Sequence, residues 1–203
     1  MSEESWRLFF AVQVPEMVKD ELQQAQAGLQ RAGLSGARWT PREQLHLTLR
    51  FLGNVEARRL DDLLVAARVV CGGFLPLALR AAQIGFFPHE RPPRVVWAGV
   101  KGNEAQLGAL QHQLQHATLS FTTEPPEPRF VAHITLARLK TVSRSTSRQL
   151  LASAGRLGKR EFGAWTATGV ALMRSELGAA GAHHSEVAIL PLGAASGTAP
   201  EPG

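Results

Sequence analysis

The chain has 203 residues, 44% of them hydrophobic, which suits one domain of ordinary size or two small fused lobes. Its 22 lysines and arginines exceed its 17 aspartates and glutamates, and this net charge of +5 weakly favours anionic partners such as phosphates or RNA. A single cysteine, Cys71, excludes an intramolecular disulfide and fits a reducing cytoplasm. We expect no signal peptide and no membrane span, because no apolar run reaches roughly 18 residues.

The first half of the chain is predicted to alternate strands and helices, from the spacing of its apolar residues. The expected elements are a strand over 8–14, a helix over 16–32, a short strand over 38–40, a strand over 45–52 and a helix over 55–70. Cys71 ends the second helix and is expected to be a small buried residue rather than a nucleophile.

The second half repeats this alternation, which predicts an α+β or α/β sandwich. The expected elements are an extended segment over 75–87, a loop over 88–93, a strand over 94–100, a helix over 103–119, a strand over 130–139, a short helix over 145–151 and strands over 165–175 and 186–192. The loop between the last two strands contains His183 and His184. Residues 193–203 are small, polar and rich in Pro and Gly, and we expect a disordered tail there.

One short pattern, His-apolar-Thr-apolar, occurs at 46–49 and again at 133–136. Because alternate side chains of a strand share a face, His46 and Thr48 would point to one side, and Leu47 and Leu49 to the other. His133 and Thr135 would do the same. Two such strands supply one imidazole that gives a proton and one that takes it. The alternative interpretation is two ordinary strands with half-buried His and Thr.

The two motifs are 87 residues apart, and the same offset relates 7–12 to 94–99, where Arg7 aligns with Arg94 and Ala11 with Ala98. Each of these apolar strands is followed by a helix-like segment and then by a His-x-Thr strand. The pattern indicates an internal repeat of one βαβ-like lobe.

Other candidate sites are weaker. His112 and His116 are four apart, as in a helical zinc motif, but the required glutamate is missing and we expect them on a helix surface. We expect His183 and His184 in a plain loop. No phosphate-binding glycine loop, dinucleotide fingerprint or nucleophile elbow is present in the sequence.

An arginine follows each motif and could clamp a phosphate with its bidentate guanidinium, or could be a solvated strand end. Arg50 would share the face of His46 and Thr48. Arg138 would lie on the apolar face by strict alternation, unless a bulge or the end of the strand redirects it.

Together these features resemble the two-histidine phosphoesterases, and within them the RNA 2′,3′-cyclic phosphodiesterases, also called 2′-5′ RNA ligases. The matching stretches are Arg7-Leu8-Phe9-Phe10-Ala11-Val12, Trp39-Thr40-Pro41, Leu45 to Gly53, Val96-Trp97, Phe130 to Arg138 and Ser175-Glu176-Leu177. The resemblance implies one bilobal α+β domain over 1–192, with two pseudo-symmetric lobes (pseudo-repeats about 7–53 and 94–140) around a central cleft.

The resemblance also implies an activity: hydrolysis of an RNA or nucleotide 2′,3′-cyclic phosphate to a 2′-phosphate, with joining of tRNA halves as the reverse chemistry. It makes His46 the proton donor and His133 the proton acceptor. Thr48, Thr135, Arg138 and Arg50 would bind the substrate. No metal or cofactor and no membrane is implied, and we expect a monomer.

The chain departs from the family in one respect, since the family often carries a Tyr near the position of His184 and this sequence has no Tyr. Base stacking at that edge is therefore an open question. Two alternatives are a sister enzyme acting on 2′-5′ oligoadenylate or a cyclic-phosphate sugar nucleotide, and a non-catalytic RNA- or nucleotide-binding module.

Overall fold

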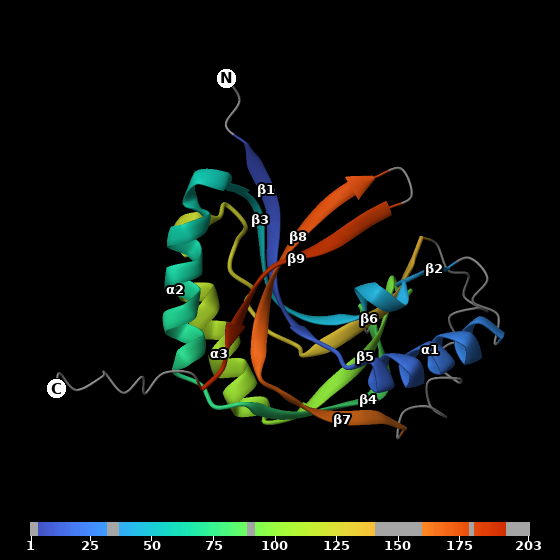
Figure 1. Ribbon diagram of the computed structural model, residues 1–203. Coiled ribbons are helices and arrows are strands. Elements are labelled where there is room, and N and C mark those ends of the chain that lie inside the picture. Colours follow the sequence, from blue (N-terminus) through green and yellow to red (C-terminus); the bar gives the residue numbers. More distant parts are fainter. Residues whose placement is uncertain (1–3, 32–36, 89–91, 141–159, 179–180, 194–203) are drawn as a thin grey trace.

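The computed structural model describes residues 4–31, 37–88, 92–140, 160–178 and 181–193 (Figure 1). Within these residues the strands are β1 (Ser5–Gln13), β2 (Ala37–Trp39), β3 (His46–Glu56), β4 (Leu77–Phe87), β5 (Val95–Gly102), β6 (His133–Leu139), β7 (Glu161–Ala167), β8 (Gly169–Gly178) and β9 (Gly181–Pro191). The α-helices are α1 (Glu16–Arg31), α2 (Leu60–Gly72) and α3 (Glu104–Ala117). Short 3₁₀ turns cover Arg42–Gln44, Ala57–Arg59 and Leu119–Phe121.

The strands form one curled antiparallel sheet that divides into two halves of matching strand order. One half runs β9-β8-β1-β3, the other β6-β5-β4-β7, and β2 pairs with β6. The halves meet where β3 and β6 pair through Leu47 and Ile134. In this order β1 corresponds to β5 and β3 to β6, as the 87-residue repeat predicts. The two His-x-Thr strands are therefore the central pair.

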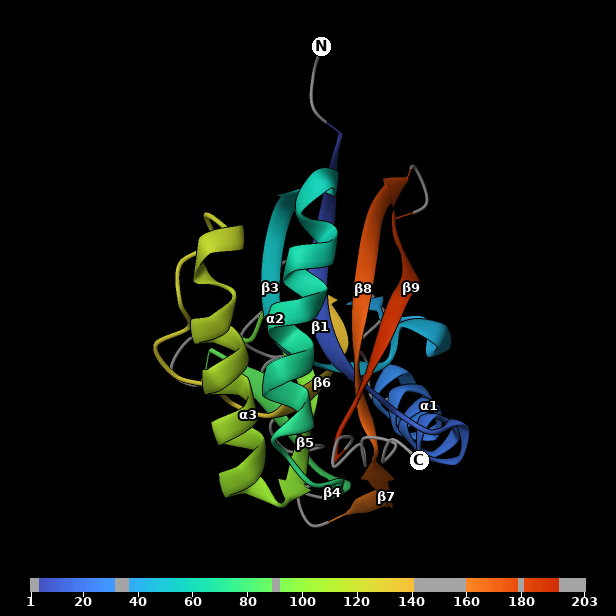
Figure 2. The ribbon, with the colours of Figure 1, turned by 60° about the vertical axis from the view of Figure 1, so that its left-hand side comes forward.

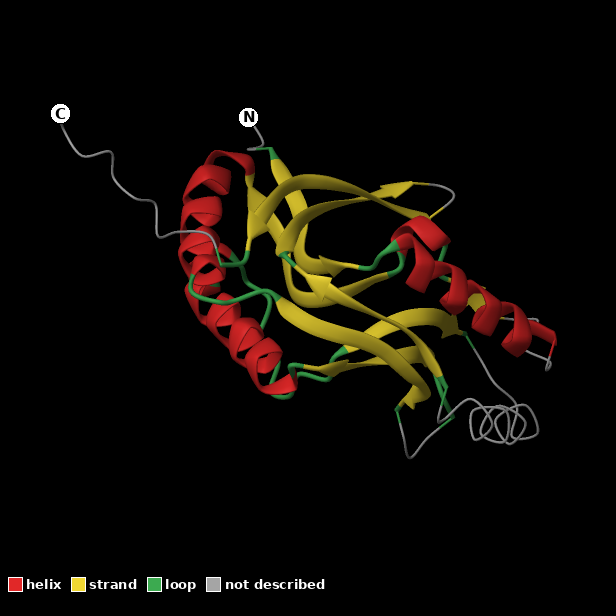
Figure 3. Cartoon of the chain, turned by 60° about the horizontal axis from the view of Figure 1, so that its bottom comes forward, coloured by secondary structure: helices red, strands yellow, loops and turns green. Residues whose placement is uncertain are grey.

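The helices cover the sheet on two sides (Figures 1, 2 and 3). Helices α2 and α3 lie side by side, and α1 lies on the other side of the molecule, where it contacts β7. Helix α1 buries Val18, Leu22, Ala25 and Leu29, the three- and four-residue spacing that predicted it. Cys71 at the end of α2 is fully buried, as expected.

The structure confirms the α+β class and most predicted elements, and it corrects three of them. Strand β3 continues through Gly53, whose φ of 62° suits glycine, to Glu56, so the helix predicted over 55–70 begins only at Leu60. The strand predicted over 165–175 is two strands, β7 and β8, divided at Thr168, and the prediction covered only the last three residues of β7. The final hairpin is longer than predicted, and it turns the expected loop around His183 and His184 into part of β9.

Some predictions fall outside the described residues: the short helix over 145–151, most of the tail over 193–203 and the middle of the 88–93 loop. Among the described helices, none is both long and apolar enough to span a membrane.

Candidate active site

The two predicted histidines begin the two central strands. His46 is the first residue of β3 and His133 the first of β6, and the pairing of Leu47 with Ile134 sets the motifs next to each other. As alternation requires, Leu47 and Ile134 are fully buried in the core, and the histidines and threonines are only partly buried. His46, Thr48, His133 and Thr135 all line one cleft of about 1070 Å³.

Each imidazole is oriented by the backbone. Nδ1 of His46 lies 2.7 Å from the carbonyl oxygen of Gln44, and Nδ1 of His133 lies 2.7 Å from that of Val131. A carbonyl only accepts, so Nδ1 of each ring carries the proton and donates it. Nε2 is then the nitrogen left for chemistry in both rings. In His46, Nε2 lies 3.0 Å from the hydroxyl oxygen of Thr48.

A β-bulge follows each motif at the same place in the repeat. Leu49 in β3 has no partner between the pairs Ala11–Thr48 and Phe10–Arg50. Leu136 in β6 has none between Trp97–Thr135 and Val96–Ala137. The extra residue shifts by one the alternation of side chains between the two faces of the strand. The side chain two positions after each bulged residue therefore faces the cleft. Those residues are Phe51 and Arg138, and both line it.

The bulge overturns the expectation for Arg50. Its side chain is 1% exposed and is not among the residues that line the cleft. Its guanidinium donates 2.7 Å hydrogen bonds to the carbonyl oxygens of Glu124 and Pro125. Arg50 thus fastens the 122–126 segment to the back of β3 and does not reach the phosphate site. Arg138 does line the cleft, because the bulge at Leu136 redirects its side chain, as the sequence had allowed.

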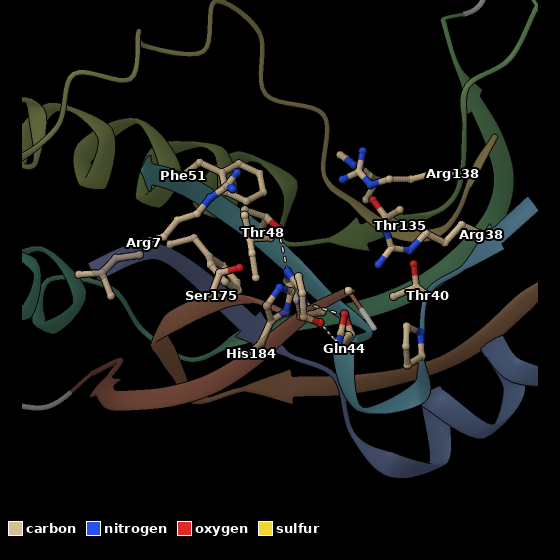
Figure 4. Close-up of a pocket in the computed structure, with 18 of the residues that line it drawn as sticks. Arg7, Arg38, Thr40, Gln44, Thr48, Phe51, Thr135, Arg138, Ser175 and His184 are labelled. Carbon is tan, nitrogen blue, oxygen red and sulfur yellow. Dashed lines mark hydrogen bonds between the residues drawn. The ribbon is translucent and has the colours of Figure 1, made fainter. Parts of the chain in front are cut away.

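The cleft is strongly basic. Four arginines line it, Arg7, Arg38, Arg129 and Arg138, against one acidic residue, Glu127. Arg7 and Phe51 lie on the Thr48 side, and Arg38 and Arg138 on the Thr135 side (Figure 4). Arg7, Arg38 and Phe51 were not predicted as site residues, because single arginines and aromatics carry no spacing signal in a sequence.

His184 is a cleft residue, contrary to the plain-loop prediction. Its ring lies edge-on to His46, with centroids 5.5 Å apart, and edge-on to Phe9 at 4.9 Å. Phe9 in turn packs against His46 at 5.0 Å. Across the cleft, Phe87 meets the His133 ring edge-on at 5.2 Å. Each catalytic candidate is therefore held by aromatic contacts as well as by its carbonyl.

The surroundings of His46 disfavour its charged form. Burial, followed by the positive charge of His184, lowers the pKa of His46 to about 4, although the Gln44 carbonyl opposes the shift. Burial and the charges of His183 and Arg7 also lower the pKa of His184. His46 is therefore neutral at pH 7 in the free cleft. Among the described residues, no group of three or more His, Cys, Asp or Glu could hold a metal ion.

Two pseudo-equivalent lobes that each present a His-x-Thr strand to one basic cleft define a two-histidine phosphoesterase. The chain belongs to the LigT-like phosphoesterase family, whose model matches residues 12–97 and 100–183.

Named relatives and solved structures agree with this family. The chain is 31% identical to the RNA 2′,3′-cyclic phosphodiesterase of Methanothermobacter thermautotrophicus, over 92% of this chain and 98% of that protein. A crystal structure of TT0787 of Thermus thermophilus covers 92% of this chain and 98% of its own, with 31% identity and a TM-score of 0.76. E. coli LigT, crystallised with 3′-AMP, has the same fold at a TM-score of 0.73 and 23% identity, covering 93% of this chain and 99% of its own.

Proposed function

We propose that the protein hydrolyses 2′,3′-cyclic phosphates at RNA ends to 2′-phosphates. The observation that carries this proposal is the pair of His-x-Thr strands on one basic cleft, each with Nε2 of its imidazole left for chemistry. Relatives that are similar over nearly their whole length are named RNA 2′,3′-cyclic phosphodiesterases. A cyclic phosphodiester carries one negative charge, which four arginines in the cleft would attract.

In the proposed reaction His133 acts as general base and His46 as general acid. Nε2 of His133 takes a proton from water, the water oxygen attacks phosphorus, and the bond from phosphorus to the 3′ oxygen breaks. Nε2 of His46 gives its proton to that departing oxygen, which becomes the 3′-hydroxyl, and the phosphate stays on the 2′ oxygen. In 2′-5′ ligation a 5′-hydroxyl would attack in place of water, with His133 again taking the proton of the nucleophile and His46 giving one to the 3′ oxygen. The two roles would exchange only in the reverse of ligation, in which the 3′-hydroxyl attacks a 2′-5′ bond and the 5′-hydroxyl departs.

The threonines and Arg138 would stabilise the charge that grows on the non-bridging oxygens. In the free cleft the Thr48 hydroxyl is engaged with His46 Nε2, and on substrate binding it would turn to a phosphate oxygen. Thr135 is its counterpart on β6, and Arg138 lies on the same side of the cleft (Figure 4). A guanidinium and two hydroxyls supply enough donors for the two non-bridging oxygens of one cyclic phosphate.

Substrate binding also explains how His46 becomes an acid. Its lowered pKa leaves it neutral in the free cleft. A phosphate anion placed beside it attracts the positive charge of the imidazolium and so offsets the burial that disfavours that charge, which raises the pKa of His46. The donor is thus charged mainly when a substrate is present.

The test is a comparison of substrates in the presence of EDTA. A short RNA ending in a 2′,3′-cyclic phosphate, 2′-5′ oligoadenylate and a cyclic-phosphate sugar nucleotide would be incubated with the protein and the products separated. We expect the RNA to be the preferred substrate and to yield a 2′-phosphate. Preferred cleavage of either of the other two, or a 3′-phosphate product, would overturn the proposal. No turnover of any of the three would favour a binding module.

A further inference from the structure

Arg38 is seated against the tip of the β8–β9 hairpin. Gly181, the first residue of β9, has a φ of 126°, a conformation that favours glycine. A Cβ atom at this position would collide with Nη2 of Arg38. The hairpin therefore leaves room for the guanidinium by having no side chain there. Nearby, the side-chain amide of Gln44 donates a 2.5 Å hydrogen bond to the carbonyl oxygen of Ala182, which ties the start of β9 to the turn that precedes His46.

The charge of Arg38 is not neutralised by the residues that the structure describes. It pairs in register with Arg138 across β2 and β6, so two like charges stand directly opposite each other, which is unfavourable. No described carboxylate forms an ion pair with either arginine, and both side chains line the cleft. An anion bound by Arg38 would offset this repulsion.

The guanidinium of Arg38 lies at the far end of the hairpin from His46. Along β9, Gly181, against which it rests, is three residues from His184, which contacts His46. Three residues of strand extend about 10 Å. A charge-assisted hydrogen bond to phosphate is only about 2.7–2.9 Å long. A guanidinium that rests against Gly181 is therefore suited to a second phosphate, not to the phosphate on which His46 and His133 act.

We propose that Arg38 forms a second phosphate subsite, which binds the phosphate on the 5′ side of the terminal nucleoside. This inference rests on the proposed function and narrows its substrate class. The preferred substrate would be an RNA chain, or a nucleoside cyclic phosphate that also carries a 5′-phosphate, rather than a bare nucleoside 2′,3′-cyclic phosphate. The cleft volume of about 1070 Å³ exceeds the upper end of common small-ligand sites and leaves room for the additional phosphate.

The catalytic test compares adenosine 2′,3′-cyclic phosphate with the same compound bearing a 5′-phosphate. We expect the 5′-phosphate to raise kcat/KM about 10- to 100-fold, the range of one charge-assisted hydrogen-bonded contact. Arg38→Gln should remove most of this gain, and Arg38→Lys should keep part of it, because lysine retains the charge without the fork. The ratio between the two substrates cancels any general loss of active protein.

Arg80→Gln is the matched control, since it removes one positive charge from a strand outside the cleft. It should leave the ratio unchanged. A ratio near one in the unchanged protein, or an undiminished ratio in Arg38→Gln, would overturn the subsite. An equal drop in Arg80→Gln would show a general charge effect and overturn it as well.

A binding measurement separates this inference from the proposed function. Calorimetry with adenosine 2′,5′-bisphosphate and adenosine 2′-monophosphate needs no turnover. We expect the bisphosphate to bind about tenfold or more tightly, and Arg38→Gln to abolish the difference. If that pattern appears without any hydrolysis, the proposed function fails and the subsite stands. Equal affinities for the two compounds would contradict the subsite, whatever the activity.

Discussion

His46 and His133 are held in the same way on two different strands. Nδ1 of each donates a 2.7 Å hydrogen bond to the carbonyl oxygen of the residue two positions earlier, which leaves Nε2 facing the reaction. The two rings differ in their neighbours. His46 packs against Phe9 and a third imidazole, His184, whereas His133 meets Phe87. The same backbone device thus presents two imidazoles in unequal electrostatic surroundings.

The pKa of His46 should depend on the cleft's occupant and on His184. In the free protein we expect a pKa of about 4, rising when adenosine 2′-monophosphate binds. His184→Phe keeps a ring in place and removes a positive charge, so it should also raise the pKa of His46. Titration of the histidine Cε1 protons by NMR measures both shifts, and His112→Gln, on the surface of α3, is the control. A His46 pKa that does not respond to the anion would contradict the proposed charging of the acid.

The same shift makes folding stability depend on pH. An unfolded His46 takes up a proton near pH 6.5, whereas the folded one does so only near 4. The unfolded state therefore binds more protons between these values, and His46 lowers the free energy of unfolding by up to about 3 kcal/mol as pH falls from 6.5 to 4. In urea unfolding at several pH values, the free energy of unfolding of His46→Asn should fall less between pH 6.5 and 4 than that of the unchanged protein. Parallel curves for the two proteins would refute this contribution.

Arg50 and Arg138 should separate stability from activity, although each follows a His-x-Thr motif. Arg50→Met leaves two carbonyl oxygens without their guanidinium and should lower the free energy of unfolding by about 2–4 kcal/mol. Arg138→Met changes an exposed cleft residue and should cost less than about 1 kcal/mol while slowing turnover. Urea unfolding and initial rates, compared between the variants, test this contrast. Reversed effects would place Arg50 in the substrate site after all.

Each threonine should contribute to the rate but not to folding. Thr48→Ala and Thr135→Ala remove one hydroxyl donor from the phosphate site, and we expect about a 10²-fold loss in kcat for each. Thr→Ser keeps the hydroxyl and should recover most of that rate. If Ser and Ala variants were equally slow, the methyl group rather than the hydroxyl would be the important feature.

Cys71 should be chemically inert in the folded protein. It is fully buried, and burial raises the pKa of its thiol to about 11. Because the thiolate is the reactive form, a disulfide reagent at about pH 8 should label the thiol only after unfolding. Fast labelling of the native protein would show that the end of α2 opens readily.

The sequence predicted the features that depend on local spacing. The helical period of residues 18–29 predicted α1. The 87-residue repeat predicted that β3 and β6 occupy corresponding positions in the two halves of the sheet. The repeated His-x-Thr pattern indicated both histidines and the cleft face of their strands. These features follow from the period of the backbone, which a single sequence displays directly.

Features that depend on partners distant in the chain were not predictable. Leu49 looks like any other alternating residue, and only its pairing with β1 makes it a bulge that turns Arg50 into the core and Phe51 out. His184 contacts His46 only because β9 pairs with β8, in the same half of the curled sheet as β3. Glycines around residue 180 suggested a loop, whereas β9 pairs with β8 at every residue from Gly181 to Glu186.

The most direct test of the two-histidine mechanism is a rate measurement on a short RNA ending in a 2′,3′-cyclic phosphate, in EDTA, with His46→Asn, His133→Asn and the control His112→Gln. The mechanism predicts that each of the first two variants forms the 2′-phosphate about 10²- to 10⁴-fold more slowly, and that the control matches the unchanged protein. All should remain folded by circular dichroism. Full activity in either His46→Asn or His133→Asn would contradict the mechanism.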